Sequence, residues 1–416
     1  MSFDLLVVGL GYVGLPLARA ATGAGLAVAG LDIEPSTVAA LRAGRSTVRD
    51  VSDADVAGML DAGFTAGTDP ELVARAKAVA ICVPTGLAAD GRPDLGPLRA
   101  ACRTVAGHLR AGMLVVVEST SFPGTTEELA APLLETSGLA AGVDFHLAYS
   151  PERVDPGNTL YGIANTPKVV SGLTRVCAKQ CAALYEQFVD HVVVARGTRE
   201  AELAKLLENT YRSVNIALVN EFARYCHQVG ADIWDVVACA GTKPFGFQSF
   251  RPGPGVGGHC IPVDPVYLLH GAPDDAFPLV RAALHTNRVM PDHVVGRAAR
   301  LLAEQGVALP GARITLLGVS YKPDTEDVRE SPALHVARGL ADLGAEVGWH
   351  DPHVADLPLH GVRLRRQADP YAAAADAHLV VLLQAHSAYD VGALAKGARL
   401  LFDTTGRASG EGVVRL

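Results

Sequence analysis

The chain has no excess of positive charge. Its 36 Lys and Arg residues are outnumbered by 44 Asp and Glu residues, which gives a formal net charge of −8. Nucleic-acid binding relies on basic side chains that neutralise phosphates, so this balance argues against it as the main function. A local basic pocket for one small anion remains compatible with the composition.

Long hydrophobic runs are also absent. The longest, LVVV at 114–117 and LVVLL at 379–383, are far shorter than the ~20 apolar residues that span a bilayer. The N-terminus reads MSFDLLVVGLG, with an acidic residue where a signal peptide carries basic ones. We therefore expect a cytoplasmic protein without a membrane segment.

Cysteine patterns of structural sites are missing. The seven cysteines are an odd number, are scattered along the chain, and form no CxxC pair. Neither a disulfide framework nor a metal site is expected. Cys177 and Cys181, four apart on a predicted helix, are interpreted as packing residues. With 416 residues, 49% of them hydrophobic, the chain predicts two or three globular domains.

Short apolar runs alternate with helical patterns over the first 195 residues. Strands that alternate with helices predict a parallel, doubly wound α/β sheet. The expected strands lie in 3–9, 26–32, 77–83, 112–120, 146–154, 167–172 and 191–195, and helices are expected at 12–24, 35–43 and 95–109.

The middle of the chain is helical. Residues 198–230 contain no Pro and only a terminal Gly, and they predict one long helix with an apolar stripe. More helix is expected at 231–241 and 278–305. The segment 241–265 between them is rich in Gly and Pro, and is either an ordered loop or a disordered linker. The apolar stripe consists of Leu203, Leu207, Tyr211, Val214 and Leu218.

The last third of the chain repeats the opening. Both regions read as a strand, a Gly, a turn, a helix and a strand that ends in an acidic residue, Asp32 or Asp351. The predicted fold class is α/β, with two Rossmann-like doubly wound domains joined by a long central helix and a helical connector. The expected domains are 1–197, 198–307 and 308–416.

A glycine pattern follows the first strand. Gly9, Gly11 and Gly14 form GxGxxG, which permits a tight turn and a close approach of the backbone to a pyrophosphate. Asp32 ends the next strand, where it would bind ribose hydroxyls and repel a 2′-phosphate, so NAD is favoured over NADP. The alternative is a tight glycine turn without a ligand. The C-terminal copy lacks these glycines, and its Lys322 and Arg329 suggest a different anionic ligand.

Cys260 lies in the segment GPGVGGHCIPVDP, beside Asp264. Glycine and proline allow backbone shapes there that other residues avoid. The loop is compatible with a nucleophilic cysteine and also with a small buried residue. The adjacent His259 is interpreted as structural.

Other polar residues lie where ligands bind in such folds. Lys205, Asn209 and Arg212 share one face of the long helix, which is either solvated or functional. The segment Glu118–Thr120 and Glu152 follow strands whose ends form the ligand-binding edge of a doubly wound sheet.

These pieces together resemble a known family. The motifs GLGYVGLPLA, VPTG, EST-x-x-PGTT, SPERVDPG, ENTYRSVNIALVNEFA, TKPFGF-x-x-F-x-PGPGVGGHCIP-x-DP and GVSYKPDTEDVRESP are similar to those of nucleotide-sugar 6-dehydrogenases of the UDP-glucose/UDP-N-acetylmannosamine type. The resemblance runs nearly from end to end. It implies oxidation of a sugar C6 alcohol to a carboxylate with two NAD+ and one cysteine.

The resemblance also implies roles for individual residues. Cys260 would hold C6 as a thiohemiacetal and then a thioester, Lys205 and Asn209 would stabilise the oxyanion, Asp264 with Thr120 would hold a water, and Glu152 would be the base for hydrolysis. The expected cofactor-binding residues are Gly9, Gly11, Tyr12, Val13, Gly14, Asp32, Pro84, Thr85, Ser119, Thr120 and Arg329. The expected substrate-binding residues are Glu152, Arg153, Val154, Lys205, Asn209, Phe250, Arg251, Gly257 and Lys322.

The branch of the family follows from two motifs. SPERVDPG and TKPFGF with PGPG resemble the N-acetylhexosamine branch, which implies UDP-N-acetylmannosamine or UDP-N-acetylglucosamine as the substrate, with UDP-glucose as the alternative. Arg251 stands where this branch has an aromatic residue. By resemblance, 1–197 binds NAD, 198–307 carries the Cys loop and forms a homodimer or larger homo-oligomer, and 308–416 binds the UDP-sugar.

Two other functions share some of these sequence features. A catalytically inactive sensor would not need the set Glu152, Lys205, Asn209, Cys260 and Asp264, which is complete here. A two-electron hydroxyacid dehydrogenase would share the N-terminal domain and a helical connector, but it would need neither Cys260 nor a second nucleotide domain.

Overall fold

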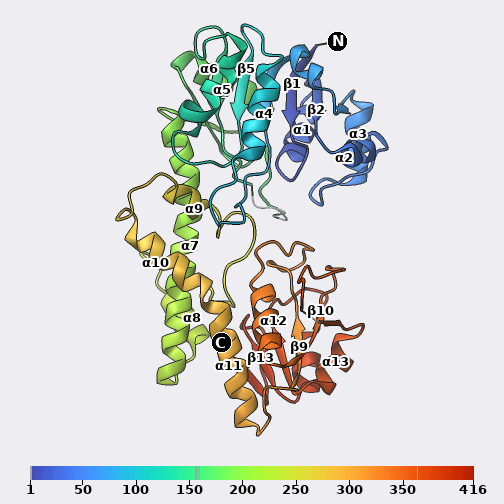
Figure 1. Cartoon of the computed structure of the whole chain (residues 1–416), viewed down its shortest axis with the longest axis vertical. Helices are drawn as coiled ribbons and strands as arrows, with labels where there is room; N and C mark the ends of the chain where they lie inside the picture. Colours follow the sequence, from blue (N-terminus) through green and yellow to red (C-terminus); the bar gives the residue numbers. More distant parts are fainter. Residues whose placement is uncertain (1, 155–157, 159, 363) are drawn as a thin grey trace. The chain divides into compact units, whose positions relative to one another are not determined.

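The computed structural model describes residues 2–154, 158, 160–362 and 364–416 (Figure 1). Contacts divide the chain into two units: unit 1 is Met1–Glu208 with Val266–Ala272, and unit 2 is Asn209–Pro265 with Pro273–Leu416. Asp155, Pro156 and Gly157 of the SPERVDPG motif lie outside the described residues.

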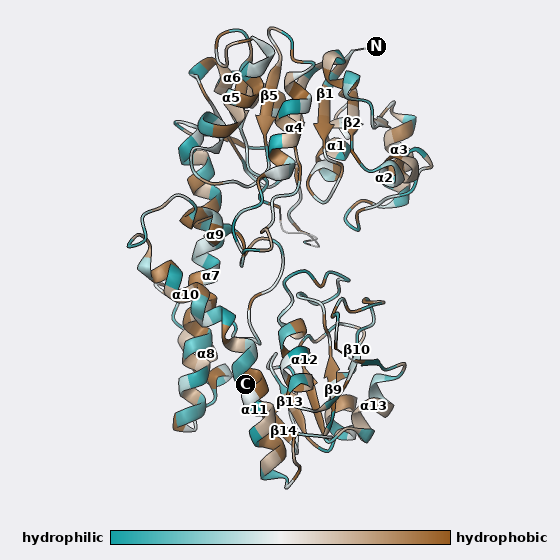
Figure 2. Cartoon of the chain, in the orientation of Figure 1, coloured by the Kyte–Doolittle hydropathy of each residue, from teal (hydrophilic) through white to brown (hydrophobic). Residues whose placement is uncertain are grey.

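Unit 1 is built on an eight-stranded sheet with the order β3-β2-β1-β4-β5-β6-β7-β8. The central strands are almost wholly apolar and buried, and they are brown in Figure 2. Parallel strands read this way because helices cover both faces of the sheet. The strands are β1 (Phe3–Val8), β2 (Val28–Leu31), β3 (Thr65–Gly67), β4 (Ala76–Ile81), β5 (Leu114–Val117), β6 (His146–Tyr149), β7 (Lys168–Gly172) and β8 (Val192–Val194).

One strand departs from the predicted parallel sheet. β7 runs antiparallel to β6, with Ala148 opposite Gly172 and Tyr149 opposite Ser171. Within the described residues no helix lies between these strands, and only a parallel neighbour needs such a crossover. The first residue of β7, Lys168, therefore lies at the edge where β5 and β6 end.

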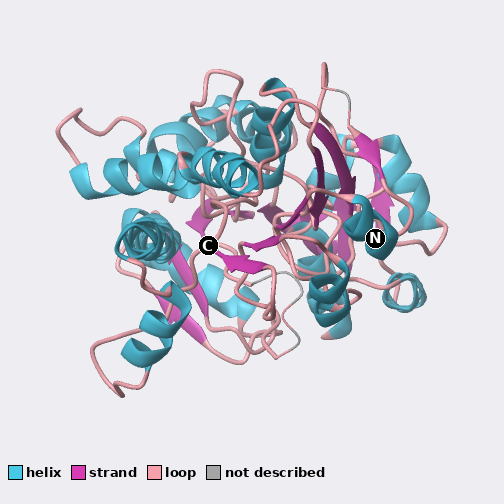
Figure 3. Cartoon of the chain, turned by 90° about the horizontal axis from the view of Figure 1, so that it is seen from below, coloured by secondary structure: helices cyan, strands magenta, loops and turns pink. Residues whose placement is uncertain are grey.

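Two layers of helices cover the sheet of unit 1 (Figure 3). One apolar core forms under α1, α2, α3 and α6, and a second under α4, α5, η1 and η2. Cys177 and Cys181 are fully buried in α6, which confirms their predicted packing role. The helices are α1 (Gly14–Gly23), α2 (Pro35–Arg42), α3 (Asp53–Asp61), η1 (Pro70–Arg75), α4 (Gly96–Ala106), η2 (Thr126–Ala130), α5 (Ala131–Leu134), η3 (Glu135–Ser137) and α6 (Arg175–Tyr185).

The long helix predicted from the sequence is α7 (Thr198–Val229), which passes from unit 1 into unit 2. Its apolar stripe faces outward: Leu203, Leu207 and Leu218 are 41%, 69% and 52% exposed. The opposite face carries Lys205 and Asn209, which are buried at 9% and 7% exposure. The interpretation of this polar face as solvated is wrong for both residues, because neighbouring segments cover it.

Unit 2 contains a six-stranded, all-parallel sheet with the order β11-β10-β9-β12-β13-β14. The predicted helix 278–305 is two helices, since Pro291 in the first turn of α11 lacks the amide that a continuous helix needs. The strands are β9 (Arg313–Leu317), β10 (Glu346–His350), β11 (Arg365–Arg366), β12 (Leu379–Leu382), β13 (Leu401–Asp403) and β14 (Val413–Arg415). The helices are α8 (Ile233–Gly241), α9 (Asp264–Leu269, which begins in unit 2 and ends in unit 1), α10 (Pro278–Arg288), α11 (Met290–Glu304), α12 (Pro332–Asp342), α13 (Pro370–Asp376) and α14 (Val391–Gly397).

Among the described residues, no helix combines the length and the apolar character that crossing a membrane requires.

Candidate active site

The glycine loop joins β1 to α1. Gly9 has a φ of +90°, and a Cβ there would lie 2.8 Å from the carbonyl oxygen of Cys82. A Cβ on Gly14 would lie 1.8 Å from the carbonyl oxygen of Gly9, whereas one on Gly11 would meet nothing within 4 Å. Two of the glycines thus permit tight packing, and the third leaves an open approach to the backbone.

This loop suits the phosphates and ribose of a dinucleotide. The N-cap residue of α1, Val13, supplies no side-chain hydrogen bond to the first amides of the helix, which remain suited to an anion. Asp32 accepts hydrogen bonds from the amides of Leu10 (2.7 Å) and Glu34 (2.9 Å), so its carboxylate is fixed at the end of β2. Tyr12 is exposed beside the loop.

Four other predicted cofactor residues, Pro84, Thr85, Ser119 and Thr120, lie at the same edge of the sheet, whereas Arg329 belongs to unit 2. The hydroxyl of Ser119, after β5, donates to the carbonyl oxygen of Val83, after β4, at 2.7 Å. Thr85 is buried, Thr120 is half-buried and Pro84 is exposed. Ligands of doubly wound folds bind outside the carboxyl ends of the strands, which is where these residues are found.

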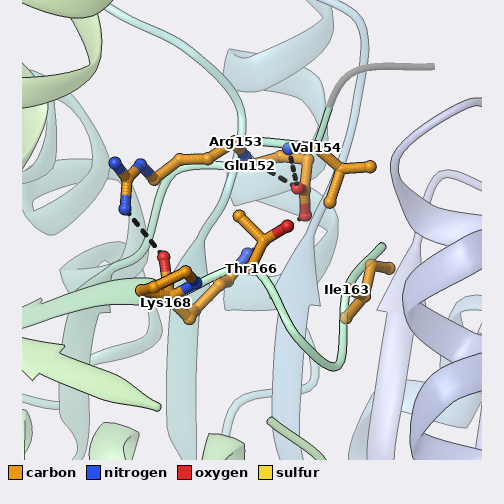
Figure 4. A pocket seen from close by; sticks show the side chains of 7 residues that line it. Glu152, Arg153, Val154, Ile163, Thr166 and Lys168 are labelled. Atoms are coloured by element: carbon orange, nitrogen blue, oxygen red, sulfur yellow. Dashed lines mark hydrogen bonds and ion pairs between the residues drawn. The ribbon is translucent and has the colours of Figure 1, made fainter. Parts of the chain in front are cut away.

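Glu152 follows β6 and is held on both carboxylate oxygens. Oε1 accepts the amides of Arg153 and Val154, each at 2.7 Å, and Oε2 lies 3.2 Å from Nζ of Lys168. Burial alone would raise the pKa of Glu152, but the Lys168 ammonium and the two amides hold it below its ordinary value. Figure 4 shows this carboxylate in a small pocket that Ile163 and Thr166 also line.

Cys260, Asp264 and Asn209 form a connected group in unit 2. The amide of Asp264 donates to the carbonyl oxygen of Cys260 at 2.8 Å. Its side-chain carboxylate accepts a hydrogen bond from the amide group of Asn209 on α7, and both side chains are buried. The Cys260 residue itself is exposed.

The Gly- and Pro-rich segment is an ordered loop, packed on the ring of Tyr321. Gly258 has a φ of +87°, and a Cβ there would lie 2.6 Å from Cε2 of Tyr321. A Cβ on Gly257 would lie 2.7 Å from Cβ of the same tyrosine. The amide of Gly258 also donates to the carbonyl oxygen of Arg329 at 3.0 Å.

The start of this loop rests on α7. The side chain of Asn220 accepts the amide of Gly253 at 3.0 Å. The ring of Phe250 lies edge-on to Tyr211, with ring centroids 5.8 Å apart, whereas Arg251 is exposed.

The C-terminal counterpart of Asp32 does not leave a carboxylate for ribose. Asp351 is 1% exposed, and its Oδ2 accepts the amides of Val319 (2.8 Å) and Ser320 (3.1 Å) and faces Nε2 of His386 at 2.9 Å. In unit 2 this carboxylate holds the turn after β9. In unit 1 the corresponding turn, after β1, is formed by glycines. The C-terminal sheet therefore does not repeat the ribose site.

Asp324, His353 and His386 bring three potential metal-ligand atoms within 4.8 Å of one another. Nδ1 of His386 accepts the amide of Asp324 at 2.8 Å, and Nε2 faces Asp351. Both ring nitrogens are thus engaged, and we assign no metal to this cluster.

Three models of the UDP-glucose/GDP-mannose dehydrogenase family match the chain in order. The NAD binding domain matches residues 4–189, the central domain residues 199–289, and the UDP binding domain residues 315–408. The chain belongs to this family.

Relatives of this dehydrogenase match most of its length. It is 38% identical over 352 residues to the UDP-N-acetyl-D-mannosamine dehydrogenase of Pyrococcus horikoshii, a match that covers 84% of each chain. It is 35% identical to the UDP-N-acetyl-D-glucosamine 6-dehydrogenase of Pseudomonas aeruginosa, over 95% of each. The solved structure titled as the UDP-ManNAc dehydrogenase of Pyrococcus horikoshii superposes with a TM-score of 0.89 at 33% identity, covering 99% of this chain and 98% of that one.

Family membership confirms several predictions made from the sequence. The resemblance, the α/β class with two Rossmann-like sheets, the NAD cofactor and the nucleotide-sugar dehydrogenase activity are all supported. The residues of the glycine loop fit NAD, which supplies a hydride acceptor when bound.

Sequence reasoning missed one part of this dehydrogenase's site. The sequence patterns predict no role for Lys168 or Tyr185, and they indicate Glu118 only as part of a segment at the end of a strand. Their signal is faint: Lys168 is the one charged residue in the apolar run PKVVSG.

Proposed function

We propose that this dehydrogenase oxidises the C6 primary alcohol of a UDP-N-acetylhexosamine, UDP-N-acetylmannosamine or UDP-N-acetylglucosamine, to the carboxylate. The observation that carries the proposal is the exposed Cys260, whose backbone is hydrogen-bonded to Asp264 and through it to Asn209. The sugar is supported by the names of relatives at 38% and 35% identity.

The chemistry requires the removal of two hydrides, each with one proton. Loss of the first hydride converts the alcohol to an aldehyde. The Cys260 thiolate adds to the aldehyde carbon and forms a thiohemiacetal, which still carries a hydrogen on C6. Loss of the second hydride leaves a thioester, and water cleaves the C–S bond to release the acid and the thiol.

Other side chains of the chain would serve these steps. We assign Lys205 and Asn209 to the oxyanion at C6, since fixed donors stabilise developing negative charge. Asp264, with Thr120, would hold the water, and Glu152 would accept its proton during hydrolysis. The buried position of Lys205 and the bond between Asn209 and Asp264 support these roles.

The remaining predicted residues are assigned to the two nucleotides. For NAD these are Gly9, Gly11, Tyr12, Val13, Gly14, Asp32, Pro84, Thr85, Ser119, Thr120 and Arg329. For the UDP-sugar they are Glu152, Arg153, Val154, Lys205, Asn209, Phe250, Arg251, Gly257 and Lys322. The division 1–197, 198–307 and 308–416 belongs to the same proposal, and the ranges of the three matching models support it. The cytoplasmic location stays a prediction.

The proposal includes a homodimer formed through α7. Its apolar stripe is continued by Phe222 and Tyr225, which are 50% and 60% exposed. A contiguous, exposed apolar face of this length on a helix is typical of a protein interface.

The test is a substrate panel. Purified protein is given NAD+ with UDP-N-acetylmannosamine, UDP-N-acetylglucosamine, UDP-N-acetylgalactosamine or UDP-glucose, and NADH is counted per sugar. We expect two NADH per molecule of an N-acetylhexosamine substrate. One NADH with accumulating aldehyde contradicts the thioester route, and preferred turnover of UDP-glucose contradicts the sugar assignment.

Cys260→Ser is expected to abolish formation of the acid and to retain NAD binding. Cys239→Ser is the matched control, because Cys239 is the other exposed cysteine and lies on α8. Turnover that resists both thiol alkylation and Cys260→Ser would favour a two-electron hydroxyacid dehydrogenase instead.

A further inference from the structure

A buried lysine stands next to the carboxylate that we assign as the base. The register of β6 and β7 pairs Tyr149 with Ser171, and its continuation places Lys168 opposite Glu152. A parallel β7 would have put Lys168 at the other end of the sheet. The antiparallel direction of β7 therefore places a positive charge at the edge of the sheet where Glu152 lies.

Lys168 bridges two carboxylates. Its Nζ lies 2.6 Å from Oε2 of Glu118 and 3.2 Å from Oε2 of Glu152. Glu118 also accepts a hydrogen bond from the hydroxyl of Tyr185 on α6. Lys168 is 4% exposed and Glu118 1%, so the bridge is shielded from solvent.

The two carboxylates of the bridge differ in the direction of their pKa shifts. Burial raises the pKa of Glu118, and Lys168 offsets only part of that rise, whereas the pKa of Glu152 is lowered. Burial would lower the pKa of Lys168, but the two carboxylates raise it, so the ammonium stays charged. The other titratable groups that face it are Tyr185, whose ring lies 5.2 Å from Nζ, and the thiols of Cys82 and Cys181, whose pKa values burial raises.

We propose that Lys168, held in place by Glu118, is a positioning residue that keeps the Glu152 carboxylate ionised and oriented for hydrolysis of the thioester. This inference rests on the proposed function. A purely structural role explains it poorly, because an apolar cluster of the same volume stabilises a fold as well as a buried ion pair does. A general base, by contrast, must be an ionised carboxylate before it can accept a proton at neutral pH. An adjacent fixed cation favours that ionised form.

The test compares Lys168→Met with Lys168→Arg and with Lys77→Met, which removes an exposed lysine of the same sheet. Acid release is followed over pH, and the covalent adduct on Cys260 is measured by mass spectrometry of the intact protein. In Lys168→Met the pKa of Glu152 is expected to rise, so the acid limb moves up by about 1 pH unit or more. Acid release should slow by at least about 10-fold and by no more than the ~10²–10⁴-fold that a general base supplies, because Glu152 loses the contact that orients it, and the thioester adduct should accumulate.

Lys168→Arg should restore most of the rate, and Lys77→Met should behave as wild type. Glu118→Gln provides a second test that does not remove the lysine: it deletes a negative charge near Glu152, so the acid limb should move down instead of up. If Lys168→Met fails to fold, this opposite shift still decides the matter.

Two results overturn the inference while the proposed function stands: an unchanged acid limb in both Lys168→Met and Glu118→Gln, or equal slowing of all steps without an adduct. Wild-type protein that yields one NADH per sugar and no adduct on Cys260 overturns the proposed function itself, and this inference with it.

Discussion

The side-chain amide of Asn209 donates a hydrogen bond to the carboxylate of Asp264, and both groups are buried. Asn209 comes from the long helix α7 and Asp264 from the start of α9, four residues after Cys260. An amide can donate to a carboxylate without adding charge, whereas a second carboxylate cannot. The contact therefore depends on asparagine at 209.

Replacement of Asn209 by Asp should make stability depend on pH. The two buried carboxylates would repel each other and raise one pKa in the folded protein, so the folded state would bind an extra proton at low pH. We expect the variant to be close to wild type near pH 5 and to lose about 3 kcal/mol by pH 8. Thermal unfolding at both pH values measures this, with Asn215→Asp on the same helix as the control. A pH-independent deficit would contradict the stated contact.

Leu218→Glu should convert the protein to monomers. The charge would sit in the middle of the exposed apolar stripe of α7, where a partner helix would have to bury it. Sedimentation velocity should then show a species of the chain's own mass, 43.3 kDa. Arg224→Glu, ~200° around the helix from Phe222, should leave the wild-type assembly intact. A wild-type protein that sediments as a monomer would refute the interface.

Arg297→Met should stabilise the protein. Arg297 on α11 is 6% exposed, its guanidinium lies 5.4 Å from the ring centroid of Phe402, and its Nε has no hydrogen-bond partner among the described residues. Burial and the charge of Arg300 lower its pKa, which shows that the charged form is disfavoured there. We expect the free energy of unfolding to rise by about 1 kcal/mol.

Thermal unfolding of Arg297→Met measures the effect, and Arg300→Met, at an exposed position one turn further along the helix, is the control. Destabilisation by Arg297→Met would mean that an anion or a partner's carboxylate neutralises the guanidinium in solution.

Asp351→Asn should weaken the C-terminal sheet in a pH-dependent way. Burial alone would raise the pKa of Asp351, but His386 and the surrounding amides lower it to about 2. A depressed carboxyl pKa stabilises the fold above the unfolded value near pH 4, and this stabilisation is lost as the pH falls through about 2. The variant should be roughly 2.5 kcal/mol less stable at pH 7, because the shift of nearly two pKa units corresponds to about 1.4 kcal/mol per unit.

The deficit of Asp351→Asn should shrink as thermal unfolding is followed from pH 5 to pH 3. The exposed Asp274→Asn serves as the control. A deficit in stability that stays constant over this pH range would contradict this explanation. The loss of stability would then come from altered packing and not from the lost charge.

Local patterns predicted most of the fold. The glycine loop, the long helix α7 and the central strands of both sheets were recognisable because period and turn residues are properties of neighbouring positions, whereas the short strands β3, β11, β13 and β14 were not predicted. Cys260 was recognisable because its loop has a long motif. The residue assignments at the site stay predictions until the variants are measured.

What escaped the sequence depends on contacts between distant residues. The direction of β7 decides whether Lys168 meets Glu152, and the apolar run of β7 has no pattern of its own that distinguishes an antiparallel strand from a parallel one. Likewise, a helix with one apolar and one polar face is expected to bury the apolar one, yet α7 buries Lys205 and Asn209. Only the tertiary structure shows which face the rest of the chain covers.

The packing of Gly257 and Gly258 on Tyr321 has an evolutionary consequence. A Cβ at Gly258 would enter the space of the Tyr321 ring, whereas a Cβ at Gly257 would meet the Cβ of Tyr321 and the carbonyl oxygen of Glu330, which remain when the ring is removed. Position 258 is therefore tied to a residue more than sixty positions away, whereas position 257 is tied to the backbone, so glycine at 257 should persist even in homologues with a small residue at 321.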